Sequence, residues 1–298
     1  MKKIGKITFN LARFLLLTSL YFALFAFGGS LVAPYLPTTP AQPGPVDQLT
    51  GVIIVSAACT LVVILMITSS LWHGWKLAGA MSLAYYGAVT LVTQLEAWYF
   101  LYGKTIGSEL MPRLFLQGLP TAFLFVPIAV VVLWRVHQVK GEFPPLLPTP
   151  LKEWLWKLGV IILAYLALYE LAGYFIAWQN PELRAFYNQP GPALPFFRQL
   201  ASQIANDPWL VPYQAVRALI WTACALPILL GSRWKLWQTA LVVGLLFSVP
   251  QNLGHILPNS LIPLNSVRIS HMLETASSTF VFGLIVTWLF FPKKAPPS

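Results

Sequence analysis

Six ionisable residues inside long apolar segments are the residues of this sequence best suited to chemistry. They are Glu96, Glu170, Arg217, His255, His271 and Glu274. A charged side chain in the hydrocarbon of a membrane costs roughly 2.5–3.5 kcal/mol on the insertion scale, so such residues face the interior of a bundle, pair with one another and often mark a site. Their types suit acid–base catalysis, ion pairing, binding of polar groups or metal coordination.

The spacing of these residues places them on shared helix faces. Residues three or four positions apart lie on the same side of a helix. Gln251 and His255 form one such pair, and Arg268, His271 and Glu274 form a second set. We expect His271 and Glu274 to be the central pair of the site, because both side chains leave the helix in the same direction.

A divalent metal is one interpretation of this pattern. Zinc is bound in some enzymes by two histidines and one glutamate, with a fourth position left for water. His255, His271 and Glu274 could supply such a set, and Glu96 or Glu170 would then act as the general base. The spacing of His271 and Glu274 is a common one, however, and the motif HExxH is absent. A metal-dependent, membrane-embedded hydrolase is therefore an alternative and not the main prediction.

The main prediction is a site for an amphiphilic, lipid-linked or small polar molecule. Arg217 and Arg268 would hold an anionic head, the carboxylates would accept hydroxyl or amine hydrogens, and aromatic side chains would bury a tail. A proton-coupled transporter is another alternative, with carboxylates and histidines as the relay. In a purely structural network, Arg217 would pair with Glu170 or, as the other candidate, with Glu96.

Composition indicates a membrane protein. Of 298 residues, 57% are hydrophobic and only 9% are charged, whereas soluble domains carry about 25% charged residues. The net charge of +10 is explained by the positive-inside rule and not by nucleic-acid binding. The sequence contains no phosphate-binding glycine loop, nucleophile elbow or CxxC pair.

The fold class predicted is an all-α bundle of eight transmembrane helices. Each apolar stretch is long enough to cross about 30 Å of hydrocarbon. The stretches lie near 11–35, 50–72, 77–102, 113–135, 154–178, 212–231, 235–257 and 268–291.

The distribution of basic residues predicts that both termini are cytoplasmic. With the N-terminus inside, the inner side receives Lys2, Lys3, Lys6, Arg13, Lys76, Arg135, Lys140, Lys152, Lys157, Arg233, Lys235, Lys293 and Lys294. The outer side receives only Lys104, Arg113, Arg184, Arg198 and Arg268. This orientation satisfies the positive-inside rule. It also places all six ionisable residues of the site near the outer face of the membrane.

We expect a single transmembrane domain over 1–298, built from two four-helix halves, 1–137 and 153–298. The proline-rich segment 138–152 is predicted to be a cytoplasmic connector. The outer loop 179–211 contains a good helix start at Asn180 and is predicted to cover the polar layer as a lid. The lid residues expected to lie over the site are Glu182, Arg184, Tyr187 and Arg198.

Several short motifs in the second half resemble a family of uncharacterised bacterial multi-pass membrane proteins. They are Ala177-Trp178-Gln179, Pro181, Arg184-Ala185-Phe186-Tyr187, Pro258-Asn259, Pro263, Val267-Arg268, His271, Glu274 and Phe282-Gly283. The resemblance covers roughly 170–291. It implies a protein of a bacterial plasma membrane, but it implies no activity. Nothing in the sequence indicates the oligomeric state.

Overall fold

The computed structural model describes residues 2–135 and 150–292, and within these ranges the chain is all-helical, with no β-strand. The first half forms α1 (Lys2–Ser30), η1 (Ala33–Tyr35), α2 (Gln48–Ser69), α3 (Gly74–Tyr86), η2 (Gly87–Leu91), α4 (Val92–Leu101), α5 (Leu110–Leu116), η3 (Pro120–Phe125) and α6 (Val126–Val132). The second half forms α7 (Leu151–Ala172), η4 (Gly173–Ala177), α8 (Pro181–Phe186), α9 (Phe196–Asn206), α10 (Leu210–Gly231), α11 (Leu236–Asn252), η5 (Leu253–Ile256) and α12 (Asn265–Phe290).

Seven helical stretches of the described chain are long and apolar enough to cross a membrane. They are Asn10–Tyr35, Gln48–Ser69, Leu110–Val132, Leu151–Ala177, Leu210–Gly231, Leu236–Ile256 and Asn265–Phe290. The expected span near 77–102 is also helical, as α3, η2 and α4 follow one another without a break, but this stretch is not among the seven. The chain is therefore a multi-pass helical protein by length and composition.

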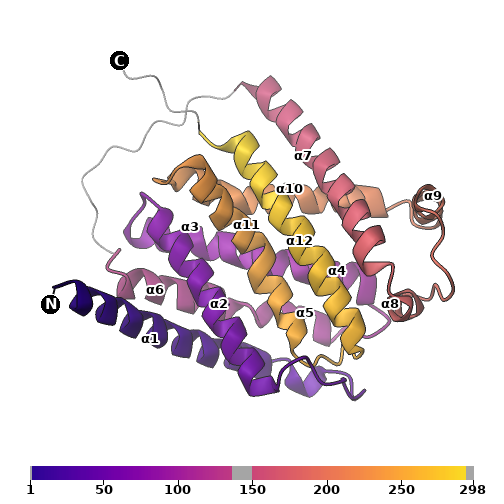
Figure 1. The fold of residues 1–298 in the computed structure, drawn as a ribbon, viewed down its shortest axis with the longest axis horizontal. Coiled ribbons are helices and arrows are strands. Elements are labelled where there is room, and N and C mark those ends of the chain that lie inside the picture. Colours follow the sequence, from indigo (N-terminus) through magenta and orange to yellow (C-terminus); the bar gives the residue numbers. More distant parts are fainter. Residues whose placement is uncertain (1, 136–149, 293–298) are drawn as a thin grey trace.

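The helices pack side by side into one bundle (Figure 1). One layer consists of four helices that run in similar directions: α2, α11, α12 and α7. Behind it lies a second layer, formed by α1, the α5–α6 stretch, the α3–α4 stretch and α10. Contacts close this arrangement into a ring, because α10 packs on α7 and α3 while α1 packs on α2 and η3. Helices from both predicted halves therefore share one core, and α2 of the first half packs directly on α11 of the second.

The closest pair of helices is α11 and α12, which meet at two glycines. A Cβ atom added to Gly283 would lie 2.7 Å from Gly244 Cα. Small residues allow membrane helices to approach this closely, which increases the dispersion contacts between them. This packing holds His271 and Glu274 of α12 in a defined position relative to the rest of the bundle.

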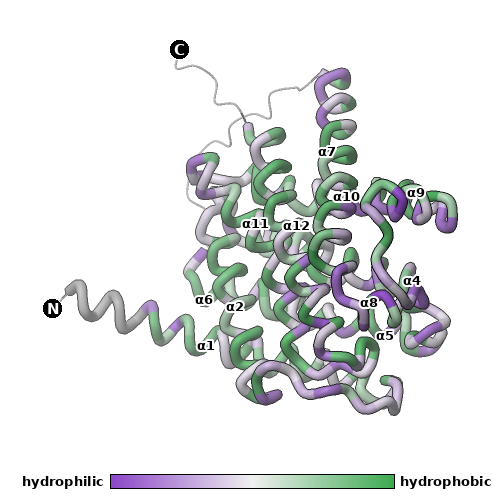
Figure 2. The backbone as a smooth tube through the Cα atoms, turned by 45° about the vertical axis from the view of Figure 1, so that its right-hand side comes forward, coloured by the Kyte–Doolittle hydropathy of each residue, from purple (hydrophilic) through white to green (hydrophobic). Residues whose placement is uncertain are grey.

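The segment between α7 and α10 forms two short helices at one end of the bundle. Asn180 caps α8 by accepting a hydrogen bond from the Glu182 amide at 2.9 Å, and Pro181 is the first helical residue. Both features match the helix start expected from the sequence. Figure 2 shows that α9 extends beside the bundle and carries both hydrophilic and hydrophobic residues. The proline-rich connector predicted at 138–152 lies almost entirely outside the described residues.

Candidate functional site

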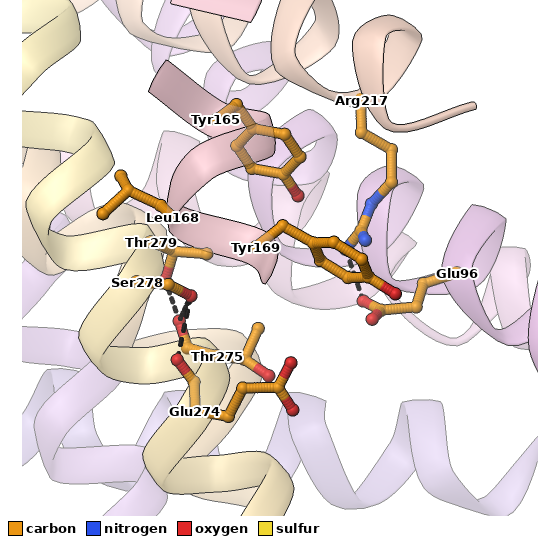
Figure 3. Close-up of a pocket in the computed structure, with 9 residues that line it drawn as sticks. All are labelled: Glu96, Tyr165, Leu168, Tyr169, Arg217, Glu274, Thr275, Ser278 and Thr279. Atoms are coloured by element: carbon orange, nitrogen blue, oxygen red, sulfur yellow. Dashed lines mark hydrogen bonds and ion pairs between the residues drawn. The ribbon is translucent and has the colours of Figure 1, made fainter. Parts of the chain in front are cut away.

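A partly buried ion pair joins α4 to α10. Arg217 Nη2 donates to Glu96 Oε2 at 2.5 Å (Figure 3). Arg217 Nη1 donates to Gln214 Oε1 at 3.0 Å. The guanidinium also lies 5.6 Å from the ring centre of Tyr213 and 5.9 Å from that of Tyr165. Arg217 is therefore held by a carboxylate, an amide and two aromatic faces.

The structure decides between the two carboxylates that the sequence offered to Arg217. Glu96 is the partner, and the preferred candidate, Glu170, is not paired with Arg217. No described group donates a hydrogen bond to Glu170, and the nearest charge that acts on it is the carboxylate of Glu274. Tyr174, one turn beyond Glu170, donates instead to the Leu194 carbonyl at 2.7 Å. Glu170 is thus a carboxylate with no hydrogen-bond donor or cation of its own.

His271 lies between a tyrosine and a carboxylate. Its Nδ1 is 3.3 Å from Glu274 Oε2, and its Nε2 is 2.9 Å from the Tyr187 hydroxyl. A carboxylate only accepts hydrogen bonds, so Nδ1 carries the proton that is shared with Glu274. While the ring is neutral, Nε2 accepts from the Tyr187 hydroxyl. Burial, with Glu96 and Glu274 nearby, raises the pKa of Tyr187 well above its usual value, which keeps this hydroxyl protonated as a donor.

These groups line a cavity of about 250 Å³. Its walls come from α4, the end of α7 with η4, the α8 region, α9 and α12. The residues that line it are Glu96, Phe100, Lys104, Tyr169, Glu170, Gly173, Tyr174, Ala177, Trp178, Leu183, Tyr187, Gln189, Gln199, Gln203, Asn206, Asp207, Leu210, His271 and Glu274. Ten of these nineteen residues are polar or ionisable and five are aromatic. Polar groups that converge in a concave pocket are typical of ligand sites.

A second and much smaller pocket adjoins this cavity. It holds about 10 Å³ and shares Glu96, Tyr169 and Glu274 with the larger cavity. Figure 3 shows Tyr169 between the Arg217–Glu96 pair and Glu274, with Thr275 and Ser278 on α12 below. A cavity of this size is at the lower limit for holding one water molecule. The small pocket is therefore the deep end of the polar site.

The loop over 179–211 covers the cavity, but mostly with other residues than those expected. Tyr187 lines the cavity as predicted. Arg184 is buried and donates to the carbonyls of Trp178 and Gly191, while Glu182 accepts a hydrogen bond from Ser266. Arg198 is exposed and lies outside the lining. Three of the four expected lid residues thus serve loop structure or face away from the cavity.

Arg268 does not belong to the cavity, although it shares a helix with His271 and Glu274. Its buried guanidinium donates to the carbonyls of Ile262, Pro263, Gln42 and Pro43 at 2.8–3.2 Å. The planar guanidinium presents five donors, so one arginine can hold two loop backbones together. The sequence-based assignment of Arg268 to a ligand's anionic head is wrong for this reason.

Gln251 and His255 also lie outside the cavity lining. Gln251 accepts from the Thr93 hydroxyl at 3.1 Å and donates to the Phe247 carbonyl, so it ties α11 to α4. The Nδ1 atom of His255 is 3.0 Å from the Asn252 carbonyl, and its ring centre is 6.4 Å from that of His271. Both residues therefore contact neighbouring helix residues and not the cavity.

The metal interpretation is not supported by the geometry. Within residues 2–135 and 150–292, no three His, Cys, Asp or Glu side chains come together as metal ligands would. His255, His271 and Glu274 therefore do not form the proposed set. The two free cysteines, Cys59 and Cys224, are buried elsewhere in the bundle.

The sequence interpretation missed several lining residues. No sequence pattern marks Tyr169 or Lys104 as a site residue. Tyr169 is simply next to Glu170 in the chain, and Lys104 lies in the turn after α4. Gln199 and Gln203 were detectable, because they alternate with apolar residues at helical spacing on α9. The structure shows that this polar face of α9 covers the cavity.

Comparison of the chain with protein-family models, with curated proteins and with solved structures finds no match. The resemblance seen in the second half thus stays a prediction, and the site itself is what bears on function.

Proposed function

We propose that this chain is a multi-pass protein of a bacterial plasma membrane and that its cavity binds or processes an amphiphilic, lipid-linked or small polar molecule from the outer side. All eight predicted helices would span the membrane, with both termini cytoplasmic. The cavity between α7, α9 and α12 would then lie in the outer leaflet. The observation that carries the proposal is this cavity of about 250 Å³, which polar and aromatic side chains line and α9 covers.

The covering helix favours a ligand that reaches the site from the membrane. Gln199, Gln203 and Asn206 of α9 line the cavity, whereas Phe197 and Ile204 on other sides of the helix are exposed. A helix with one polar and one apolar side lies naturally at a membrane interface. In this position α9 would separate the cavity from the lipid head groups and could move aside to admit an amphiphile.

A transmembrane proton relay is less well supported. Beyond Thr279, the buried residues of α12 are mainly apolar: Phe282, Val286, Leu289 and Phe290. A relay needs polar groups across the whole membrane. The polar layer and the apolar helix ends below it fit a one-sided site better than a transport path.

Acid–base chemistry on the bound molecule is the second candidate function. It is favoured by the hydrogen bonds that connect Tyr187, His271 and Glu274. A glutamate that orients a histidine, which in turn contacts a hydroxyl, is an arrangement able to move a proton. In this candidate the Tyr187 hydroxyl would face the ligand, and His271 would take up or return its proton. The Glu274 carboxylate, which contacts Nδ1, would hold the His271 ring in the tautomer that leaves Nε2 free to accept a proton.

Native mass spectrometry of the full chain, released from membranes, tests the binding proposal. We expect a co-purified molecule in the wild-type protein and its loss in His271→Ala and Glu274→Ala. Metal analysis of the same samples addresses the hydrolase alternative. If the wild type carries neither ligand nor metal and the two variants are only less stable, the polar cluster is structural and the proposal is wrong.

Reporter fusions test the topology independently of the ligand. A reporter that is active only outside the cytoplasm should stay silent when joined to either terminus. The same reporter inserted after Gly191, an exposed position between α8 and α9, should be active. An active C-terminal fusion would overturn the predicted orientation.

A further inference from the structure

The charge of the cavity lining indicates which ligands it would accept. Four carboxylates line it, from Glu96, Glu170, Asp207 and Glu274. Arg217, which lies outside the lining, neutralises Glu96, and Lys104 is the one lysine or arginine among the lining residues. Asp207 accepts hydrogen bonds only from the neutral groups of Tyr99 and Trp209. The lining therefore carries excess negative charge while His271 is neutral.

Glu170 and Glu274 are the carboxylates that need a partner. Both line the same cavity, and each repels the other, yet Glu170 has neither a cation nor a hydrogen-bond donor among the described residues. Among the described residues, His271 is the one ion-pair partner of the Glu274 carboxylate. Two carboxylates in a partly buried site are costly unless a cation or a shared proton lies between them.

The amide of Gln199 gives a second and independent indication of a ligand. Gln199 is only 5% exposed and lines the cavity, and its Nε2 atom has no hydrogen-bond partner in the described structure. Buried polar atoms are rarely left without a partner, because the loss of hydration costs about 1–3 kcal/mol. This amide would gain a hydrogen bond if a ligand in the cavity presented an oxygen acceptor to it.

The aromatic walls are suited to a positive charge. Phe100, Tyr169, Tyr174, Trp178 and Tyr187 all line the cavity. The Lys104 ammonium already lies 5.3 Å from the ring centre of Tyr187. Aromatic faces attract cations through their quadrupole, and they do so more strongly where water is excluded.

We propose that the molecule bound in this cavity has an organic cation as its head, a protonated amine with a neighbouring hydroxyl or carbonyl oxygen. This inference rests on the proposed binding function and names its ligand class. The ammonium donates to Glu170 and Glu274, the aromatic rings surround its carbon atoms, and Gln199 donates to the neighbouring oxygen. An anionic head would meet carboxylates, while the nearby Arg184 is already bonded to backbone carbonyls.

The size of the cavity limits the head group. A volume of about 250 Å³ lies just below the range of roughly 300–1,000 Å³ that is usual for pockets binding whole small molecules. The cavity thus holds a small head, and any long apolar tail extends outside it. The exposed apolar side chains of Phe175 and Ile176 lie on η4, beside the lining residues Tyr174 and Ala177. A tail that leaves the cavity there would contact lipid.

Binding of short synthetic amphiphiles to the full chain in phosphatidylcholine nanodiscs tests this proposal. The probes are hexylamine, 2-(hexylamino)ethanol, hexanoate and hexyl glucoside, which share a tail and differ in the head. Alkylamines, like lysine, have a pKa near ~10.4 and are charged at pH 7. Affinity is read from tryptophan fluorescence, because Trp178 lines the cavity, and from the rise in the unfolding temperature.

We expect the two amines to bind, the aminoalcohol more tightly, and hexanoate to bind weakly or not at all. Glu170→Gln should weaken amine binding roughly 10- to 100-fold, as expected when a hydrogen bond to a charged group is lost. Glu170 has no partner in the structure, so this variant should fold normally. Glu109→Gln, an exposed carboxylate outside the cavity, is the matched control and should leave the affinity unchanged.

The outcomes separate this proposal from the proposed function. If hexyl glucoside or hexanoate binds and the amines do not, the cavity is a ligand site but its head group is not cationic. If amines bind equally to wild type, Glu170→Gln and Glu274→Gln, they only partition into the lipid and the proposal is overturned. If none of the four probes binds, the cation proposal is overturned, and a co-purified ligand in the native mass spectrum would still support the binding function.

Discussion

The ion pair between Glu96 and Arg217 gives the most direct test of how the site is held together. Glu96→Gln keeps the shape of the side chain and removes its charge, and Arg217→Met keeps the apolar stem and removes the cation. In the wild type the two groups are 2.5 Å apart and join α4 to α10. If this contact stabilises the bundle, removing either group should reduce the effect of removing the other.

The expected magnitude follows from the burial of the two partners. The side chain of Arg217 is 1% exposed and that of Glu96 is 31% exposed. Exposed ion pairs contribute about 0.2–1 kcal/mol, whereas leaving one partner of a buried pair alone costs about 3–5 kcal/mol. Since this pair is intermediate, we expect a coupling free energy of about 2 kcal/mol, or roughly a 30-fold change in the unfolding equilibrium constant.

The neighbours of Arg217 limit the effect of Glu96→Gln. Gln214 still accepts from the guanidinium, and the rings of Tyr165 and Tyr213 still face it. In the Arg217→Met background, by contrast, Glu96 is a carboxylate without a cation. Neutralising Glu96 there should cost nothing or should stabilise the protein. The coupling therefore arises mainly from the loss of charge pairing and not from packing.

Reversible unfolding of the full chain in mixed micelles, with SDS as the denaturant, measures all four members of the cycle. A matched cycle that combines Arg217→Met with Glu109→Gln controls for the loss of a negative charge elsewhere. That cycle should be additive, because Glu109 is an exposed residue before α5. Coupling below about 0.5 kcal/mol between Glu96 and Arg217, the usual limit for independent sites, would refute the reasoning.

Gly283→Ala should destabilise the bundle by about 1–3 kcal/mol, because its Cβ would lie 2.7 Å from the backbone of α11. Thermal unfolding measures this effect. The control is Gly159→Ala, where the added Cβ has open space, and this variant should be neutral or slightly stabilising. Tyr187→Phe should cost about 1 kcal/mol in the same assay, since it removes one hydrogen bond to His271, and an unchanged stability would argue against that bond. Arg268→Lys should speed limited proteolysis of the two loops that the guanidinium joins, because an ammonium cannot span the same carbonyls, and it should leave amine binding intact; unchanged cleavage would contradict the assigned role.

Much of the helical arrangement could be predicted from the sequence, because it depends on local properties. Each expected span corresponds to a helical stretch, since about twenty consecutive apolar residues can satisfy their backbone groups only as a helix. The cap at Asn180 was likewise a local signal. The three-residue spacing of His271 and Glu274 was enough to bring their side chains together. The distance of each ionisable residue from the end of its helix likewise followed from counting residues along the chain.

Only the tertiary structure decided which of these residues meet across helices. The sequence predicts how far Glu96 and Glu170 lie from their helix ends but not the rotation of α4 and α7 about their axes, and that rotation made Glu96 the partner of Arg217. Arg268 shares a helix face with His271, yet its guanidinium donates hydrogen bonds to the carbonyls of two loops that are far apart in the sequence. The cavity itself arises because α9 turns its glutamines over α7 and α12. Packing between elements far apart in the chain sets these directions, and no local pattern in the sequence encodes them.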